Sequence, residues 1–197
     1  MIEKKYTVIY ADPPWKYKVW SGGGAADAHY PTMNLEDIKA LPVSQLAAKD
    51  CALFLWITFP MLHEAWGVMK AWGFSFRTVA FVWVKLNRVS DTLCWGMGHW
   101  TRANAEICLL AVRGHPKRQA KDVHQVIISH VEEHSKKPDE VRERIERLMG
   151  DVPRSTDRTD SAPMALLSAP AWNFDGKIPL VRGYPLKPHI ISKAVSN

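Results

Sequence analysis

Short apolar runs alternate with amphipathic segments along the first 150 residues. Each run has six to eight residues, a length typical of buried strands, and predicts strands over 6–11, 52–57, 77–84, 106–112 and 123–128. Helical spacing of apolar positions predicts helices over 34–41, 58–73 and 138–150, with Asn34 and Thr58 as caps, Pro138 as an opening residue and Gly73 and Gly150 as stops. Strands alternating with helices indicate an α/β, Rossmann-like fold with a mostly parallel sheet.

The pattern changes after residue 150. Residues 155–161 are polar, and prolines recur at positions 163, 170, 179, 185 and 188. Only weak strand signals are found, over 177–182 and 189–191. We therefore predict one domain over residues 1–152 and a divergent, irregular and partly disordered extension over 153–197.

Two long aperiodic segments interrupt the predicted elements. Residues 16–33 contain three consecutive glycines and lack a phosphate-binding motif, so they predict a flexible lid over the edge of the first strand. Residues 85–104 carry basic side chains together with Trp95 and Trp100. A loop of this length in a compact domain is usually functional or disordered, and the composition favours a nucleic-acid-facing loop.

The composition limits the class of protein. With 197 residues, 47% of them hydrophobic, the chain can bury a full core. The excess of 26 basic over 20 acidic residues, a net charge of +6, gives weak support for a polyanionic partner, and nine tryptophans suit stacking on bases. No apolar stretch approaches the roughly 18 residues of a membrane span, and the N-terminus lacks the order of a signal peptide, so we expect a cytoplasmic protein.

The cysteines and histidines do not indicate a metal or disulfide framework. Cys51, Cys94 and Cys108 are odd in number and form no C-x-x-C pair. His130 and His134 have the spacing of helical metal ligands, but no carboxylate or thiol completes a set. We predict reduced thiols and no metal site.

The tetrad Asp12-Pro13-Pro14-Trp15 directly follows the first predicted strand. Two prolines stop the strand ladder, so Asp12 and Trp15 are expected at the carboxyl edge of the sheet, where open α/β sheets bind their ligands. The Asp12 carboxylate and the Pro13 carbonyl can both accept hydrogen bonds from an amine on a planar ring, and an aromatic such as Trp15 can stack on that ring. The pattern favours chemistry on the exocyclic amine of a nucleobase, carried by orientation and electrostatics.

Further segments resemble the adenine-N6 methyltransferases with a DPPW motif, a family that uses S-adenosylmethionine. The resemblance covers about residues 6–150 and rests on segments in the family's order. These are Val-Ile-Tyr-Ala-Asp-Pro-Pro-Trp at 8–15, His-Tyr-Pro-Thr-Met at 29–33, Leu-Phe-Leu-Trp-Ile-Thr at 53–58, Trp-Val-Lys at 83–85, Gly-His-Trp-Thr-Arg-Ala-Asn at 98–104 and Ser-Lys-Lys-Pro-Asp-Glu at 135–140. Together these segments are highly specific.

The resemblance implies roles for individual residues. Asp12, Pro13, Pro14 and Trp15 would hold the target adenine, with Asp12 also facing the methyl donor. Ser135 and Lys137 would lie at the cofactor, S-adenosylmethionine, and a lysine at a helix start can pair with the donor's carboxylate. The predicted substrate contacts are Tyr30, Trp56, Lys85, His99, Trp100 and Asn104. Trp56 ends a buried strand and is also a core candidate, while Asn104 and Glu106 are expected to fix the substrate loop to its strand.

The chain departs from the family beyond the last predicted helix. Family members continue with a strand of the form Ile-Glu-Leu-Phe-Ala-Arg, which forms part of the cofactor pocket, whereas this chain has the polar segment 155–161. Three readings follow: an active enzyme on nucleic acid, with DNA preferred and a prokaryotic or phage origin; a degenerate homologue that binds nucleic acid or a partner subunit; and, less favoured, methylation of another planar amine or amide. A homo- or heterodimer is expected because no separate target-reading module is recognisable.

Overall fold

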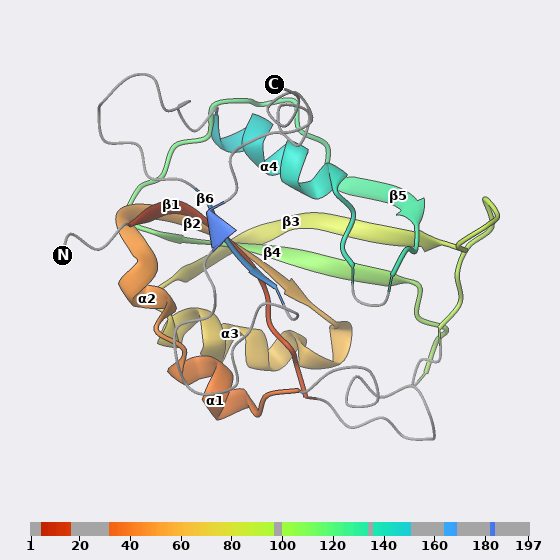
Figure 1. The fold of residues 1–197 in the computed structure, drawn as a ribbon, viewed down its shortest axis with the longest axis horizontal. Helices are drawn as coiled ribbons and strands as arrows, with labels where there is room; N and C mark the ends of the chain where they lie inside the picture. The colour runs from red at the N-terminus through yellow and green to blue at the C-terminus, as the bar shows by residue number, and fades with distance from the viewer. Residues whose placement is uncertain are drawn as a thin grey trace, which may run out of the picture.

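Figure 1 shows the computed structural model of the protein, a sheet with helices on both faces. The structure describes residues 5–16, 32–96, 100–133 and 136–150, and the backbone of 164–168 and 182–183. Its strands are β1 (Tyr6–Asp12), β2 (Ala47–Ile57), β3 (Ser75–Leu86), β4 (Ala105–Arg113), β5 (Val126–His130), β6 (Met164–Ser168) and β7 (Arg182–Gly183). Its helices are α1 (Leu35–Ala40), α2 (Val43–Leu46), α3 (Leu62–Ala71) and α4 (Glu140–Met149), with a 3-10 turn, η2 (Phe59–Met61), before α3.

The strands form one sheet in the order β5-β3-β4-β2-β1-β6-β7. β1 pairs parallel with β2 and β6, and β3 pairs parallel with β5. β4 is antiparallel to both of its neighbours, β2 and β3, and β7 is antiparallel to β6. Among the described strands, β1, β2, β3, β5 and β6 therefore run in one direction, which confirms the predicted Rossmann-like α/β fold with a mostly parallel sheet.

Each face of the sheet carries its own core, because the central strands are apolar on both sides. Helix α4 lies over one face and α1, α2 and α3 lie over the other (Figure 1). On the α3 side, Ile9 and Leu55 pack with Trp72, whose indole Nε1 donates to the Ile38 carbonyl of α1 at 2.9 Å. On the α4 side, Phe54 and Trp56 of β2 pack with buried residues of α4. This three-layer arrangement leaves the strand ends as the place for a site.

The predicted helix stops are confirmed, whereas several starts and strand ends differ: β2 begins five residues before the predicted 52–57, and β5 lies two to three residues beyond the predicted 123–128. Gly73 and Gly150 close α3 and α4 with φ of 81° and 91°, values that favour glycine over residues with a Cβ. Asn34 precedes α1 and its carbonyl accepts a bond from Ile38 N at 3.0 Å, although its side chain forms no cap bond. Thr58 does not start α3 directly, because the 3-10 turn η2, with a proline in its first turn, lies between them.

β6 corrects the reading of the region after residue 150. No strand was predicted at 164–168, yet this segment pairs parallel with β1 over five residues, from Val8↔Met164 to Asp12↔Ser168. It therefore occupies the sheet position next to the tetrad strand. β7 overlaps only the end of the candidate at 177–182, and the candidate at 189–191 lies outside the described residues.

Candidate active site

The tetrad forms a tight connection at the carboxyl end of β1. Asp12 is the last residue of β1, and the backbone N of Trp15 donates to the Pro13 carbonyl at 2.8 Å. The Pro14 carbonyl accepts from Met33 N at 2.9 Å, which ties the tetrad to the segment before α1. Neither proline has an N–H to extend the ladder, so the chain leaves the sheet here as predicted. The Pro13 carbonyl keeps a second lone pair for another donor.

Trp15 and Trp56 are structural in this arrangement. Trp15 is 4% exposed, and its indole Nε1 donates to the Trp56 carbonyl of β2 at 2.9 Å. It therefore anchors the tetrad to the neighbouring strand and presents little ring face for stacking. Trp56 is 0% exposed, and its Nε1 donates to the Tyr10 hydroxyl at 2.7 Å. Its predicted role as a substrate contact is corrected to that of a core residue beneath the site, because β2 is covered on both faces.

Four charged side chains from four parts of the chain meet at the carboxyl edge. Lys137, just before α4, lies with its Nζ 2.8 Å from Asp12 Oδ2 of β1 and 3.5 Å from Glu106 Oε2 of β4. The other oxygen of Glu106, Oε1, is 2.5 Å from Lys85 Nζ of β3. These side chains are only 12% to 23% exposed, so water screens them weakly. We call Asp12, Lys137, Glu106 and Lys85 the charge chain.

The two carboxylates of the charge chain differ in their electrostatics. Burial raises the pKa of Asp12, and the ammonium of Lys137 offsets only part of this effect. Burial also acts to raise the pKa of Glu106, but Lys137 and Lys85 together outweigh it and hold that pKa below its usual value. Glu106 is thus the firmly ionised member of the pair, and Asp12 is the more basic one.

Aromatic rings form the floor under the charge chain. Lys137 Nζ lies 5.6 Å from the ring centroid of Trp56, and Lys85 Nζ lies 4.8 Å from that of Trp83. The two indoles meet edge to face, with centroids 6.5 Å apart at 77°. Rings at these distances attract the ammonium groups and exclude water from below them. The floor therefore holds both cations at the edge of the sheet.

The predicted substrate loop is partly described. Lys85 N donates to the Asn104 carbonyl at 2.9 Å, and Gly96 N donates to the Ala103 carbonyl, so the strand pairing of β3 and β4 continues into the loop. Asn104 thus joins the loop to the sheet through its backbone. Trp100 is 99% exposed, so its ring is available to a partner. Tyr30, His99 and Ser135 lie outside the described residues.

Glu106 is the site residue whose importance the sequence did not reveal. It was expected to hold the substrate loop, whereas the structure places it between two lysines and next to Asp12. A carboxylate near the start of an apolar strand is a signal for such a role, but the signal can be used only if the direction of β4 is known. Among the described residues, no group of three His, Cys, Asp or Glu side chains could hold a metal ion.

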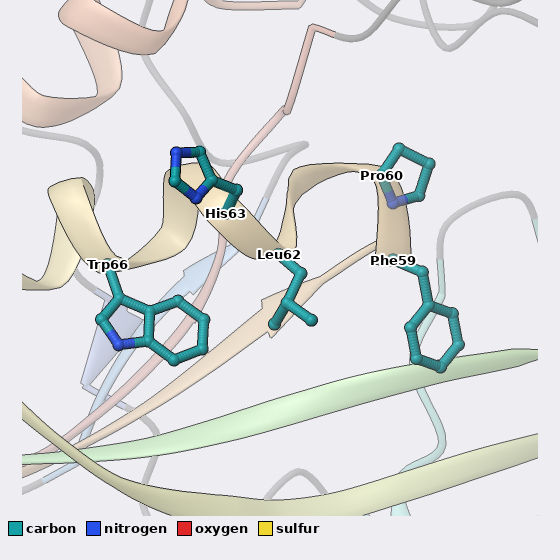
Figure 2. A pocket seen from close by; sticks show the side chains of 5 residues that line it. All are labelled: Phe59, Pro60, Leu62, His63 and Trp66. Carbon is teal, nitrogen blue, oxygen red and sulfur yellow. The ribbon is translucent and has the colours of Figure 1, made fainter.

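A groove lies along η2 and α3, apart from the charge chain. Figure 2 shows Phe59, Leu62 and Trp66 projecting to one side of α3, while His63 projects to the other. Phe59 and Trp66 are about half exposed. None of the charge-chain residues lines this groove, so it does not provide the groups that the predicted chemistry needs.

No helix within the described ranges is long and apolar enough to cross a membrane.

The edge beside β1 fits a bound cofactor with a carboxylate. β2, which follows β1 in the chain, pairs with one edge of β1, and β6 pairs with its other edge. The strand order therefore reverses between β1 and β6, and open α/β sheets bind ligands at such a switch point. Asp12 and Lys137 lie at that point. An ammonium next to a carboxylate suits a zwitterionic amino-acid group such as that of S-adenosylmethionine.

Comparison with known proteins agrees with the geometry. The MT-A70 family model matches residues 6–158. The chain is 33% identical over 165 residues to the Type II methyltransferase M.MunI of Mycoplasma sp, covering 74% of this chain and 68% of that protein. It is 31% identical over 145 residues to the N(6)-adenosine-methyltransferase MT-A70-like protein of Arabidopsis thaliana, and 33% identical over 147 residues to the human N(6)-adenosine-methyltransferase catalytic subunit METTL3.

The last two matches cover 73% of this chain but only 20% and 24% of the relatives, so the chain spans about a quarter or less of the eukaryotic proteins. The matched residues include the tetrad strand, the charge chain and α4. The chain belongs to the MT-A70 family of adenine-N6 methyltransferases.

Proposed function

We propose that this protein transfers a methyl group from S-adenosylmethionine to the exocyclic N6 amine of adenine in nucleic acid, with DNA preferred over RNA. The observation that carries the proposal is the pairing of Asp12 with Lys137 at 2.8 Å at the carboxyl edge of β1. This pair places Asp12, an acceptor for the substrate amine, next to Lys137, a cation for the donor's carboxylate.

Asp12 is the proposed acceptor for the substrate amine. Methyl transfer requires the lone pair of the adenine nitrogen to leave conjugation with the ring, and positive charge develops on that nitrogen. A carboxylate with a raised pKa accepts a hydrogen bond from the amine and stabilises the developing charge. The Pro13 carbonyl, with its second lone pair, is the proposed second acceptor.

Lys137 is the proposed residue for holding the cofactor. When bound, S-adenosylmethionine supplies the electrophilic methyl group. The ammonium of Lys137 is held from below by Trp56 and lies at the switch point, where it can pair with the donor's carboxylate. The predicted contribution of Ser135 to the same site stays a prediction.

The loop between β3 and β4 is the proposed nucleic-acid contact. Trp100 offers an exposed ring for stacking on a base, and the loop adjoins Lys85 at the charge chain. An adenine in a duplex must be extruded from the stack, at a cost of a few kcal/mol, before its amine can reach Asp12. The preference for DNA is supported by the match to M.MunI, of which 68% is covered.

The test uses radiolabelled S-adenosylmethionine with the purified protein and three substrates of equal adenine content: duplex DNA, single-stranded DNA and RNA. Asp12→Asn removes the charged acceptor with little change in volume, and Asp37→Asn is a matched control at an exposed position of α1. Label that Asp12→Asn abolishes and Asp37→Asn retains supports the proposal. Label in RNA alone overturns the preference for DNA.

The degenerate-homologue reading makes a different prediction. A strand beside β1 is present in β6, and this supports an intact sheet at the proposed cofactor edge. Calorimetry with S-adenosylmethionine separates the readings, because a protein that does not bind the donor cannot transfer its methyl group. The expected dimer and the cytoplasmic location stay predictions.

A further inference from the structure

Lys137 contacts the carboxylates of Asp12 and Glu106 among the described residues, and the proposed mechanism uses only that of Asp12. Its Nζ is 2.8 Å from Asp12 and 3.5 Å from Glu106, so the two carboxylate oxygens on either side of it are at most about 6 Å apart. Glu106 is held in turn by Lys85 at 2.5 Å. Asp12 therefore shares its counter-charge with a second, firmly ionised carboxylate.

We propose that Glu106 is a positioning residue that controls the charge of Asp12 by drawing Lys137 away from it. This inference rests on the proposed function, in which Asp12 accepts the substrate amine. An Asp12 carboxylate fully engaged by an ammonium is a weaker acceptor, and a nearby cation disfavours positive charge on the amine. Glu106 counters both effects, because it competes for Lys137 and adds negative charge beside Asp12.

Neutralising Glu106 acts on Asp12 in three ways, and all three change the pKa of Asp12 in the same direction. Neutralising Glu106 removes a negative charge near Asp12, leaves Lys137 closer to Asp12, and frees the positive charge of Lys85 from its partner. Each change favours the ionised form of Asp12 and lowers its pKa. The two carboxylate oxygens are at most about 6 Å apart and both side chains are largely buried, so the lost repulsion is only weakly screened by water.

The other titratable groups around Asp12 do not reverse this sign. Cys108 on β4 and Tyr10 on β1 are both buried, and burial raises the pKa of each well above its usual value, so both are neutral at pH 7. Arg142 of α4 acts on Tyr10. The charged groups of the described residues that shift the pKa of Asp12 include Lys137, Glu106 and Lys85.

The first experiment measures the charge of Asp12 without substrate or donor. The Asp12 carboxyl carbon is titrated by NMR in the wild-type protein, Glu106→Gln, Glu106→Asp and Lys85→Met. We expect a lower Asp12 pKa in Glu106→Gln, a value near wild type in Glu106→Asp, and a higher value in Lys85→Met, which removes a cation. An unchanged pKa in Glu106→Gln, or shifts of the same sign in Glu106→Gln and Lys85→Met, overturns the proposal.

The second experiment measures methyl transfer across pH. Glu106→Gln should lower kcat about tenfold, leave KM for S-adenosylmethionine within about threefold, and move the acid limb of kcat/KM to lower pH, while Glu106→Asp restores the limb. The matched control is Glu36→Gln, which removes an exposed carboxylate of α1 that pairs with Lys39 at 2.7 Å. A purely structural role predicts reduced stability with an unmoved acid limb. If the protein lacks methyl transfer altogether, the proposed function fails while the NMR titration still decides the role of Glu106.

Discussion

Removing Lys137 should leave Asp12 as an incompletely compensated charge at the edge of the core. Lys137→Met keeps an unbranched apolar side chain at this position, while the ammonium 2.8 Å from Asp12 and 5.6 Å from the Trp56 ring centroid is lost. Glu106 keeps Lys85 at 2.5 Å, so the destabilisation is concentrated on Asp12. Breaking a buried pair from one side typically costs about 3–5 kcal/mol, and partial exposure reduces this.

Because Asp12 can become protonated, the loss of folding stability in Lys137→Met has an upper limit. An unfolded aspartate titrates near pH 3.9, so keeping it protonated in the folded state at pH 7 costs about 4 kcal/mol. We therefore expect Lys137→Met to lower the free energy of unfolding by about 2–4 kcal/mol at pH 7. The control Lys39→Met breaks a surface pair with Glu36 and should lower it by less than about 1 kcal/mol.

The pH dependence identifies the cause of this loss. Without Lys137, the folded-state pKa of Asp12 rises further above its unfolded value, so the folded state binds the extra proton. Stability is then retained below about pH 4 and falls as pH rises toward the folded pKa. Urea denaturation at pH 4.5, 5.5 and 7 should show the deficit growing with pH, and Asp12→Asn in the same chain should recover most of it. A deficit that is equal at all three values, and that Asp12→Asn leaves in place, would refute the reasoning.

Three further changes test the fold and the loop. Trp72→Phe removes the bond from Nε1 to the Ile38 carbonyl and part of a fully buried ring, so urea denaturation should show a loss of about 2–3 kcal/mol. Trp100→Ala should leave the melting temperature within about 2 °C, because the ring is 99% exposed, yet weaken binding to single-stranded DNA at least fivefold in fluorescence anisotropy. Gly114→Ala should lower the melting temperature more than Gly73→Ala: both have positive φ, but only at Gly114 would the added Cβ lie 2.5 Å from a backbone oxygen.

The elements that the sequence predicts well are those with a strong local signal. Residues 8–11 of β1 and 51–57 of β2 are uninterrupted apolar runs buried on both faces, and α4 has a proline and acids at its start and a glycine at its stop. β6 was missed for the opposite reason. Its sequence, Met-Ala-Leu-Leu-Ser, lacks β-branched residues and follows a polar segment, although its length and the prolines at 163 and 170 are consistent with a short buried strand. Its place beside β1 comes from pairing, which local propensity does not encode.

The site residues also differ in whether a local sequence signal identifies them. Asp12 and Lys137 are 125 residues apart. Asp12 was recognisable because it directly follows a strand at the ligand edge, whereas Lys137 was singled out by the resemblance of segment 135–140 to the family. The position of Glu106 at this edge depends on the direction of the whole strand β4. Since β4 is antiparallel to β2 and β3, its first residues lie at the edge where those strands end, next to Lys85. A parallel β4 would have placed Glu106 at the opposite edge, and Asp12 would face Lys137 without a second carboxylate. The reversal of one strand therefore determines how the charge at the proposed acceptor is balanced.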